Sequence, residues 1–165
     1  MCLIFVAFTL ICGAEWHHTS ITNHIPEPAA ALPGDILAAH NAVRERLDLT
    51  PLRWSDHLTA YAQEWANQLL HEGQFHHRSH PKYGENLFEI DGPRATPANV
   101  VDIWAAEERD YSYRTNTCRG MCGHYTQLIW STTREVGCAV ARDANREVWV
   151  CNYDPPGNWL GERPY

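Results

Sequence analysis

Two β-rich stretches near the C-terminus, residues 136–142 and 147–153, flank the dipeptide Ala144-Asn145. If this dipeptide forms a two-residue turn, Cys138 faces Cys151 at a non-hydrogen-bonded position of an antiparallel pair. Cα atoms at such a position approach to about 4.5 Å, which is close enough for a disulfide. The same register aligns an apolar pair and a salt pair on one face, Val140 with Trp149 and Arg142 with Glu147. The sequence therefore predicts a hairpin tied by a Cys138–Cys151 disulfide.

Residues 1–14, with the sequence MCLIFVAFTLICGA, form an apolar run that ends in small residues. The run is too short to span a bilayer and predicts a signal peptide cleaved after Ala14, although the usual basic n-region is missing. The alternative, a lipoprotein anchor at Cys12, is disfavoured because the bulky Ile11 precedes that cysteine. We therefore expect a secreted, extracellular protein.

The chain has six cysteines, and removal of the leader would take away Cys2 and Cys12. An even number of remaining cysteines in an exported chain favours disulfides over metal ligation. The hairpin accounts for one pair, which leaves Cys118 and Cys122 to close a tight loop with each other. The alternative is a zinc site formed by these two cysteines and the nearby His124.

The formal net charge is −7, and the acidic residues show no long run. This balance gives no electrostatic reason to bind nucleic acid or an anionic membrane surface. Hydrophobic residues make up 44% of the chain and charged residues 20%, so the chain has enough apolar side chains for a sizeable core. We expect a monomer with no nucleic-acid partner and no stable insertion into a membrane.

The region between the leader and the hairpin predicts a lead-in followed by helices. Residues 15–34, with three Pro and an Ala cluster, show no sustained periodicity and predict a flexible lead-in. Apolar residues at helical spacing predict helices over residues 35–47, 55–72, 96–111 and 125–130, the first capped by Asp35. Helices followed by an antiparallel hairpin indicate one α+β sandwich domain over residues 35–165.

Several segments of the chain match a known family in the family's own order. The segments are YGENLF (83–88), HYTQLIW (124–130) and VCNYDPPGN (150–158), with HNAVR (40–44) and LRWSDHL (52–58) before them. They resemble the CAP superfamily of cysteine-rich secretory, antigen 5 and pathogenesis-related 1 proteins, whose domain is also called the SCP domain. The ending CNYDPPGNWLGERPY is most similar to the plant pathogenesis-related 1 branch. The resemblance implies a three-layer α-β-α sandwich with a small antiparallel sheet, stabilised by disulfides.

The resemblance also implies a central cavity surrounded by two His and two Glu. Matched position by position, the set is His77, Glu85, Glu107 and His124. The first His is chosen because Phe75 stands two residues before it, with His80 and His76 as alternatives. Glu108 is the alternative to Glu107. The plant branch carries two further cysteines that this chain lacks, one of them where Asp143 stands, so its disulfide pattern is not transferred.

Such a quartet suits a weak divalent-metal site, with zinc held by His77 and His124. Neutral imidazoles bind zinc, and carboxylates ligate it, orient the rings or hold a water. If the protein is an enzyme, Glu85 or Glu107 is the general base of a metal-dependent peptidase. The alternative is a satisfied buried cluster that ties loops to helices. Because the sequence supplies no nucleophile arrangement, we expect a binding or defence module rather than an enzyme.

Two further expectations concern the aromatic residues and the tail. Five Trp are interpreted as core, and some of them as lining for a sterol or fatty acid, a ligand class that the resemblance implies: Trp54, Trp65, Trp104, Trp130 and Trp149. Residues 155–165 match the form of a releasable signalling peptide in plant members. We favour the alternative, in which Trp159 and Tyr165 pack onto the domain and Gly157-Asn158 forms a turn.

Overall fold

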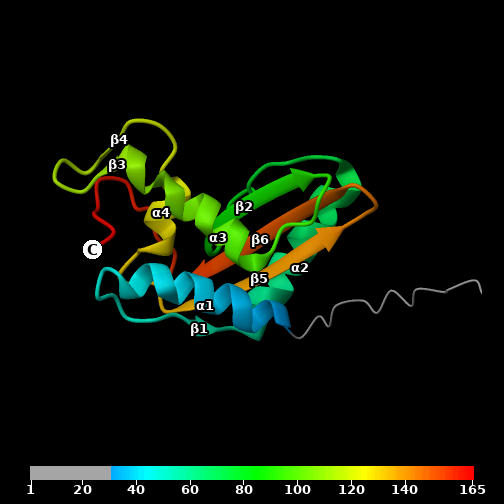
Figure 1. The fold of residues 1–165 in the computed structure, drawn as a ribbon, viewed down its shortest axis with the longest axis horizontal. Helices are drawn as coiled ribbons and strands as arrows, with labels where there is room; N and C mark the ends of the chain where they lie inside the picture. The colour runs from blue at the N-terminus through cyan, green and yellow to red at the C-terminus, as the bar shows by residue number, and fades with distance from the viewer. Residues whose placement is uncertain (1–30) are drawn as a thin grey trace, which may run out of the picture.

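The structure is a computed structural model that describes residues 31–165, so the predicted signal peptide and nearly all of the lead-in lie outside the described residues. Figure 1 shows the arrangement of the helices and strands. In chain order they are α1 (Ala31–Glu45), β1 (Arg53–Trp54), α2 (Asp56–Glu72), β2 (Gly84–Asp91), α3 (Pro97–Ala105), the 3₁₀ helix η1 (Ala106–Asp110), β3 (Tyr111–Ser112), β4 (Thr117–Cys118), α4 (Gly123–Leu128), β5 (Glu135–Arg142) and β6 (Arg146–Asp154).

The C-terminal hairpin has the predicted register. β5 and β6 pair antiparallel with Cys138 opposite Cys151, and the two cysteines form a disulfide. The carboxylate of Asp143 stabilises the turn, because it accepts hydrogen bonds from the N–H groups of Asn145 and Arg146, both at 2.8 Å. The predicted salt pair is also present, with Arg142 Nε 2.7 Å from Glu147 Oε1.

Around this hairpin the chain builds a four-stranded sheet of order β1-β5-β6-β2. β2 lies antiparallel to β6, and β1 pairs with β5 in parallel over two residues. The sequence did not predict β2, because its residues GENLFEID lack a regular alternation of apolar and polar side chains. As a result the sheet is larger than the predicted hairpin, and β2 forms one of its edges.

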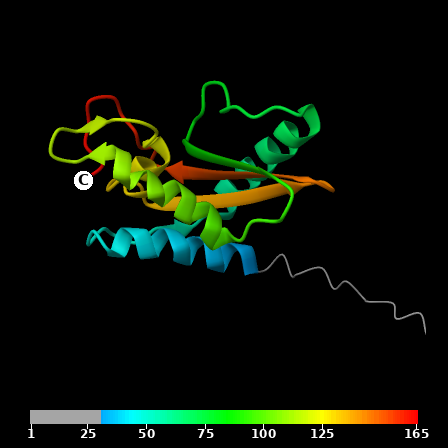
Figure 2. The same cartoon turned by 45° about the horizontal axis from the view of Figure 1, so that its top comes forward.

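Helices cover both faces of the sheet, which confirms the three-layer α-β-α sandwich (Figure 2). α2 packs on one face against Leu87, Ala139, Val148 and Val150 of the strands. α1, α3 and α4 cover the other face, where Ile36, Trp104 and Leu128 pack against Trp149 and Tyr153. Four of the five Trp interpreted as core are buried, and Trp54 is partly buried.

The helix ends follow their local sequence. α2 begins after the predicted Ser55 and ends at Gly73, whose φ of +64° permits the left-handed cap. α3 begins with a capping box between Thr96 and Asn99. The helix predicted to run towards Tyr111 is α-helical only to Ala105 and continues as the tighter 3₁₀ helix η1 to Asp110. α1 begins at Ala31, before the expected cap at Asp35.

The second disulfide joins Cys118 and Cys122, as predicted. Both sulfurs are therefore committed to each other, and the alternative zinc site of these cysteines with His124 is wrong. Within residues 31–165, no helix combines the length and apolar character needed to cross a membrane.

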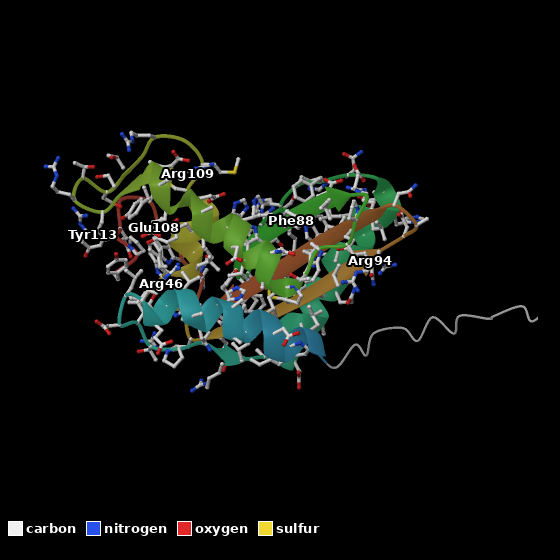
Figure 3. All side chains as sticks on the ribbon, viewed as in Figure 1. Arg46, Phe88, Arg94, Glu108, Arg109 and Tyr113 are labelled. Atoms are coloured by element: carbon white, nitrogen blue, oxygen red, sulfur yellow. A yellow bond between two sulfur atoms is a disulfide. The ribbon has the colours of Figure 1, made fainter. Side chains whose placement is uncertain are left out.

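The C-terminal tail folds back onto the domain beside Tyr113, at the opposite end of the molecule from Arg94 (Figure 3). Tyr165 stacks on Tyr113 with ring centroids 4.6 Å apart, and the N–H of Ser131 donates to the carbonyl of Pro164 at 2.6 Å. The expectation that Trp159 packs onto the domain was wrong, since this side chain is 56% exposed. The turn expected at Gly157-Asn158 lies instead at residues 160–161. Asn158 has a φ of +60°, and its Oδ1 accepts a hydrogen bond from Thr126 Oγ1 at 2.7 Å.

Candidate functional site

Glu107 of η1 holds His124 at the start of α4. Its Oε1 lies 2.6 Å from Nδ1 of His124, and its Oε2 accepts the N–H groups of His124 and Tyr125 at 2.9 and 3.3 Å. The carboxylate therefore orients the imidazole and also caps N–H groups of α4 that have no partner within the helix. The ring of His124 stacks on Trp104 with centroids 5.9 Å apart.

Glu85 of β2 makes the second histidine–carboxylate pair. Its Oε1 lies 2.9 Å from Nδ1 of His77 and accepts the N–H of Arg78 at 3.1 Å. The Glu85 side chain is buried at 2% exposure, whereas that of His77 is 60% exposed. Of the candidates for the first His, the structure thus brings His77 to Glu85, while His76 stacks edge-on against Trp65.

The two pairs are neighbours, but they do not merge into one cluster. Asn86, next to Glu85 on β2, donates from Nδ2 to the carbonyl of His124 at 3.1 Å and so links them. Among the described residues, the one group of three potential ligand atoms within 4.8 Å of one another is His40 with Cys138 and Cys151. Those two sulfurs form a disulfide, so this group is no metal site as it stands.

A buried chain of hydrogen bonds through His40, Tyr153 and Asn86 lies behind the site and was not predicted from the sequence. Nδ1 of His40 donates to the carbonyl of Ile36 at 2.7 Å, so Nε2 is the acceptor of the Tyr153 hydroxyl proton at 2.9 Å. The Tyr153 oxygen in turn accepts from Asn86 Nδ2 at 3.2 Å. Complete burial lowers the pKa of His40 from 6.5 to about 4 and raises the pKa of Tyr153 well above 10.

The sequence carried one indication of this hydrogen-bond chain, because each of its three members is a polar residue inside one of the matched segments. His40 lies in HNAVR, Asn86 in YGENLF and Tyr153 in VCNYDPPGN. All three are fully or almost fully buried, and each finds its partner on a different element. Sequence order does not show such partners, because they are separated by 67 and 113 residues along the chain.

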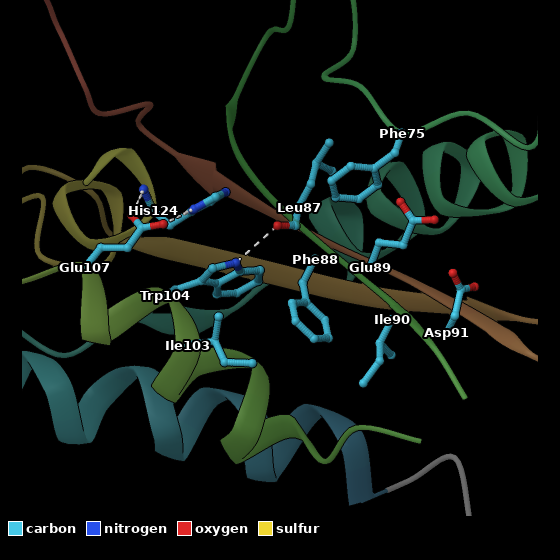
Figure 4. A pocket seen from close by; sticks show the side chains of 10 residues that line it. All are labelled: Phe75, Leu87, Phe88, Glu89, Ile90, Asp91, Ile103, Trp104, Glu107 and His124. Atoms are coloured by element: carbon cyan, nitrogen blue, oxygen red, sulfur yellow. Dashed lines mark hydrogen bonds and ion pairs between the residues drawn. The ribbon is translucent and has the colours of Figure 1, made fainter. Parts of the chain in front are cut away.

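An apolar groove opens beside the His124–Glu107 pair (Figure 4). A cavity of about 410 Å³ extends along β2 between Phe75 and the α3 residues Ile103 and Trp104. A second cavity of about 440 Å³ shares Phe88, Ile90 and Ile103 with the first and continues towards Arg94. Ile103 is 50% exposed and Phe75 is 45% exposed, so the groove presents large apolar side chains to solvent.

The chain matches the model of the cysteine-rich secretory protein family, CAP, over residues 37–153. Its fold is like that of venom allergen-like protein 4 of Schistosoma mansoni, with a TM-score of 0.69 and 25% identity over 81% of this chain and 93% of that one. The fold is also like that of MpPR-1i, with a TM-score of 0.61 and 21% identity over 81% of this chain and 94% of the other.

Curated relatives come from several plants. The chain is 42% identical to a PR-1 type pathogenesis-related protein of Sambucus nigra over 137 residues, 81% of each chain. It is 44% identical to the basic form of pathogenesis-related protein 1 of Nicotiana tabacum, over 81% of this chain and 75% of that one. It is 40% identical to pathogenesis-related protein PR-1 of Medicago truncatula, over 99% and 98% of the two chains. The chain therefore belongs to the CAP family and is of the plant pathogenesis-related 1 type.

Proposed function

We propose that the protein is a secreted binding module of the defence type, as the names of its plant relatives suggest. Its two disulfides fit an oxidising compartment, because cytosolic thiols are kept reduced. Within residues 31–165 the hydrogen bonds of the histidine side chains go to carbonyl groups, carboxylates and Tyr hydroxyls. These contacts orient the rings, and with the disulfides they support a stable binding module as the main proposal.

The observation that supports a ligand is the open apolar groove between α3 and β2. Its lining of Phe88, Ile90 and Ile103 suits a sterol or fatty acid, whose transfer out of water is favourable in proportion to the apolar area buried. The first cavity ends at the His124–Glu107 pair, so the polar end of such a ligand has a hydrogen-bonding partner there.

A weakly bound divalent cation, zinc, is the second proposed ligand. Both imidazoles face a carboxylate through Nδ1, which leaves Nε2 available, and this is the arrangement that orients histidine ligands in metal sites. The donor chemistry therefore fits zinc, with His124 and His77 as ligands. Among the described residues no three of these four side chains bring ligand atoms within 4.8 Å of one another, so joint binding of one ion would require the His77–Glu85 and His124–Glu107 pairs to move together.

The hydrolase and the peptide carrier remain secondary proposals. A peptidase would use Glu85 or Glu107 as general base, but both carboxylates are already committed to histidine and backbone N–H groups. Release of residues 155–165 would leave the sheet complete, because β6 ends at Asp154.

Binding of radiolabelled palmitate and cholesterol tests the main proposal. We expect Ile103→Asp to weaken binding at least tenfold, because it places a charge in the apolar groove. Leu160→Asp is the matched control, since Leu160 is fully exposed and does not line either cavity. Equal binding by wild type and Ile103→Asp would exclude the groove as the lipid site.

A second experiment is a zinc titration in which the NMR signals of the histidine side chains are monitored. His124→Ala should abolish the zinc response and retain palmitate binding. His71→Ala, on the exposed end of α2, should change neither. A zinc response that persists in His124→Ala would contradict the cation proposal and leave the lipid proposal standing.

A further inference from the structure

The outer edge of β2 carries backbone hydrogen-bonding groups without partners. Trp104 Nε1 donates to the carbonyl of Leu87 at 3.1 Å from outside the sheet, whereas the N–H of Gly92 donates inward to Asn145. Because the direction alternates along a strand, Glu89 and Asp91 also face outward. In the part of the chain that the structure describes, the N–H of Leu87 and both backbone groups of Glu89 and Asp91 have no hydrogen-bond partner.

Apolar surface flanks this edge on both sides. Figure 4 views the edge of β2, with Leu87 and Phe75 on one side of the strand and Phe88 and Ile90 on the other. The two cavities together follow the strand from Leu87 to Asp91, and Ile103 of α3 closes the second side. The groove therefore follows an unpaired strand edge, and any occupant of the groove lies within reach of its N–H and C=O groups.

The charges around the groove select among possible occupants. Asp91 and Asp102 make no salt bridge within the described residues, while Glu89 is paired with Arg146. A second copy added antiparallel at this edge would place carboxylates of β2 opposite carboxylates, which destabilises a strand pair. A segment that carries Lys or Arg would instead be attracted, and the formal net charge of −7 acts in the same direction.

We propose that the β2 edge binds an extended basic peptide segment as a fifth strand of the sheet. The peptide would exchange hydrogen bonds with Leu87, Glu89 and Asp91, as in other strand-addition complexes. Side chains opposite Phe88 and Ile90 would be apolar, and the one opposite Asp91 would be Lys or Arg, because facing residues share a side of the sheet. The Glu89 carboxylate is already paired with Arg146 and adds little to this selection. Trp104 occupies the Leu87 carbonyl and ends the register there.

This proposal goes beyond the lipid-binding function, because a lipid does not need the outward backbone groups. Both ligands would contact Phe88, Ile90 and Ile103, so we expect palmitate and the peptide to compete. Peptide binding without palmitate binding would contradict the lipid proposal alone, and palmitate binding without peptide binding would contradict the strand proposal alone.

Amide hydrogen exchange of the disulfide-bonded protein tests the proposal, with a capped hexapeptide of alternating Lys and Val as the probe. At saturation we expect exchange of the Leu87, Glu89 and Asp91 amides to slow at least tenfold. N-methylation at alternate backbone nitrogens gives two modified peptides, one for each edge of the bound strand. We expect the peptide that lacks the N–H donors facing β2 to bind at least tenfold more weakly. The other modified peptide should bind as the parent peptide does.

Charge reversal supplies an independent arm. Asp91→Lys combined with Asp102→Lys should weaken the peptide at least tenfold, whereas Glu45→Lys, an equally exposed change on α1, should have an effect below twofold. The proposal is overturned if the peptide leaves the three amides unprotected, if both methylated peptides bind equally, or if palmitate binds and the peptide does not.

Discussion

At the scale of single residues, His40 is a histidine that folding forces to be neutral. Its side chain has no exposure, and both ring nitrogens are already used by Ile36 and Tyr153. Protonation would place a second positive charge near Arg44, which is also buried and donates only to carbonyl oxygens. Burial is the main cause that lowers the pKa of His40; the charge of Arg44 adds to it, and the hydrogen bond to Ile36 acts in the opposite direction. This side chain therefore links folding to pH.

The sign of that linkage gives a prediction. The unfolded chain binds more protons between pH 6.5 and about 4, so the contribution of His40 is complete above pH 6.5 and is lost as the pH falls to 4. The shift corresponds to about 3 kcal/mol of unfolding free energy. Urea denaturation at pH 7 and 4 should show a larger decrease for wild type than for His40→Gln. His71→Gln should behave as wild type does, and an equal decrease in all three proteins would contradict the linkage.

The sequence predicted one histidine–glutamate quartet but not which histidine contacts which glutamate. The matched segments identified His77, Glu85, Glu107 and His124, and the structure pairs them as His77 with Glu85 and His124 with Glu107. Sequence could not show that the pairs stay separate, because their spacing depends on how η1 and the loop before β2 lie against the sheet. The resemblance implied an apolar ligand site lined by some of the five Trp, and Trp104 does line the first cavity. The contribution of Ile103 had no such signal, because it looks like any apolar residue on a helix.

At the scale of elements, the contact between α2 and β5 depends on Gly137. A Cβ at this position would lie 2.3 Å from the backbone nitrogen of Thr59 and 2.6 Å from the carbonyl carbon of Leu58. Both are main-chain atoms at the start of α2, so the helix itself would have to move. Gly34 in α1 is the opposite case, because a Cβ there meets no atom within 4 Å.

The same substitution should therefore have opposite effects at the two positions. Gly137→Ala should lower the unfolding free energy by about 1–3 kcal/mol through overpacking. Gly34→Ala should raise it by about 0.5–1 kcal/mol, because Ala favours the helix more than Gly does. Thermal or urea denaturation of the two variants measures both. A neutral Gly137→Ala would mean that α2 is free to shift away from the sheet.

The elements themselves were predictable where local patterns decide them. The β5–β6 register followed from a two-residue turn, and α2 from its apolar spacing and its Gly73 cap. β2 was not predicted, because its sequence does not alternate regularly between apolar and polar residues. It forms a strand through its pairing with β6, which lies far away in the sequence. The 3₁₀ geometry of η1 has no comparable signal in the sequence.

At the scale of the whole molecule, the two disulfides should stabilise the fold to different degrees. Cys138–Cys151 closes a separation of 13 residues in the core, and Cys118–Cys122 closes one of 4 in the surface loop before α4, where Cys118 is exposed and Cys122 is buried. Loop entropy gives about 3 kcal/mol for the first and about 2 kcal/mol for the second. Replacing Cys138 and Cys151 by Ala also leaves a void between buried strands, which adds to the loss.

We therefore expect the Cys138→Ala and Cys151→Ala double variant to lose more unfolding free energy than the double variant of Cys118 and Cys122, by about 1 kcal/mol or more. Urea denaturation without reductant measures the two values. Equal losses, or a larger loss for the surface pair, would show that the hairpin register holds without its cross-link.

The strand order has a consequence for biosynthesis. β6 lies between β5 and β2, so within residues 31–165 the strand that joins β2 to the rest of the sheet is also the last to be synthesised. A chain that emerges from the ribosome N-terminus first can form its early helices, but the layer between them stays open until Asp154 has been translated. The sheet, and with it the layer between the helices, is therefore completed only near the end of the synthesis of residues 31–165.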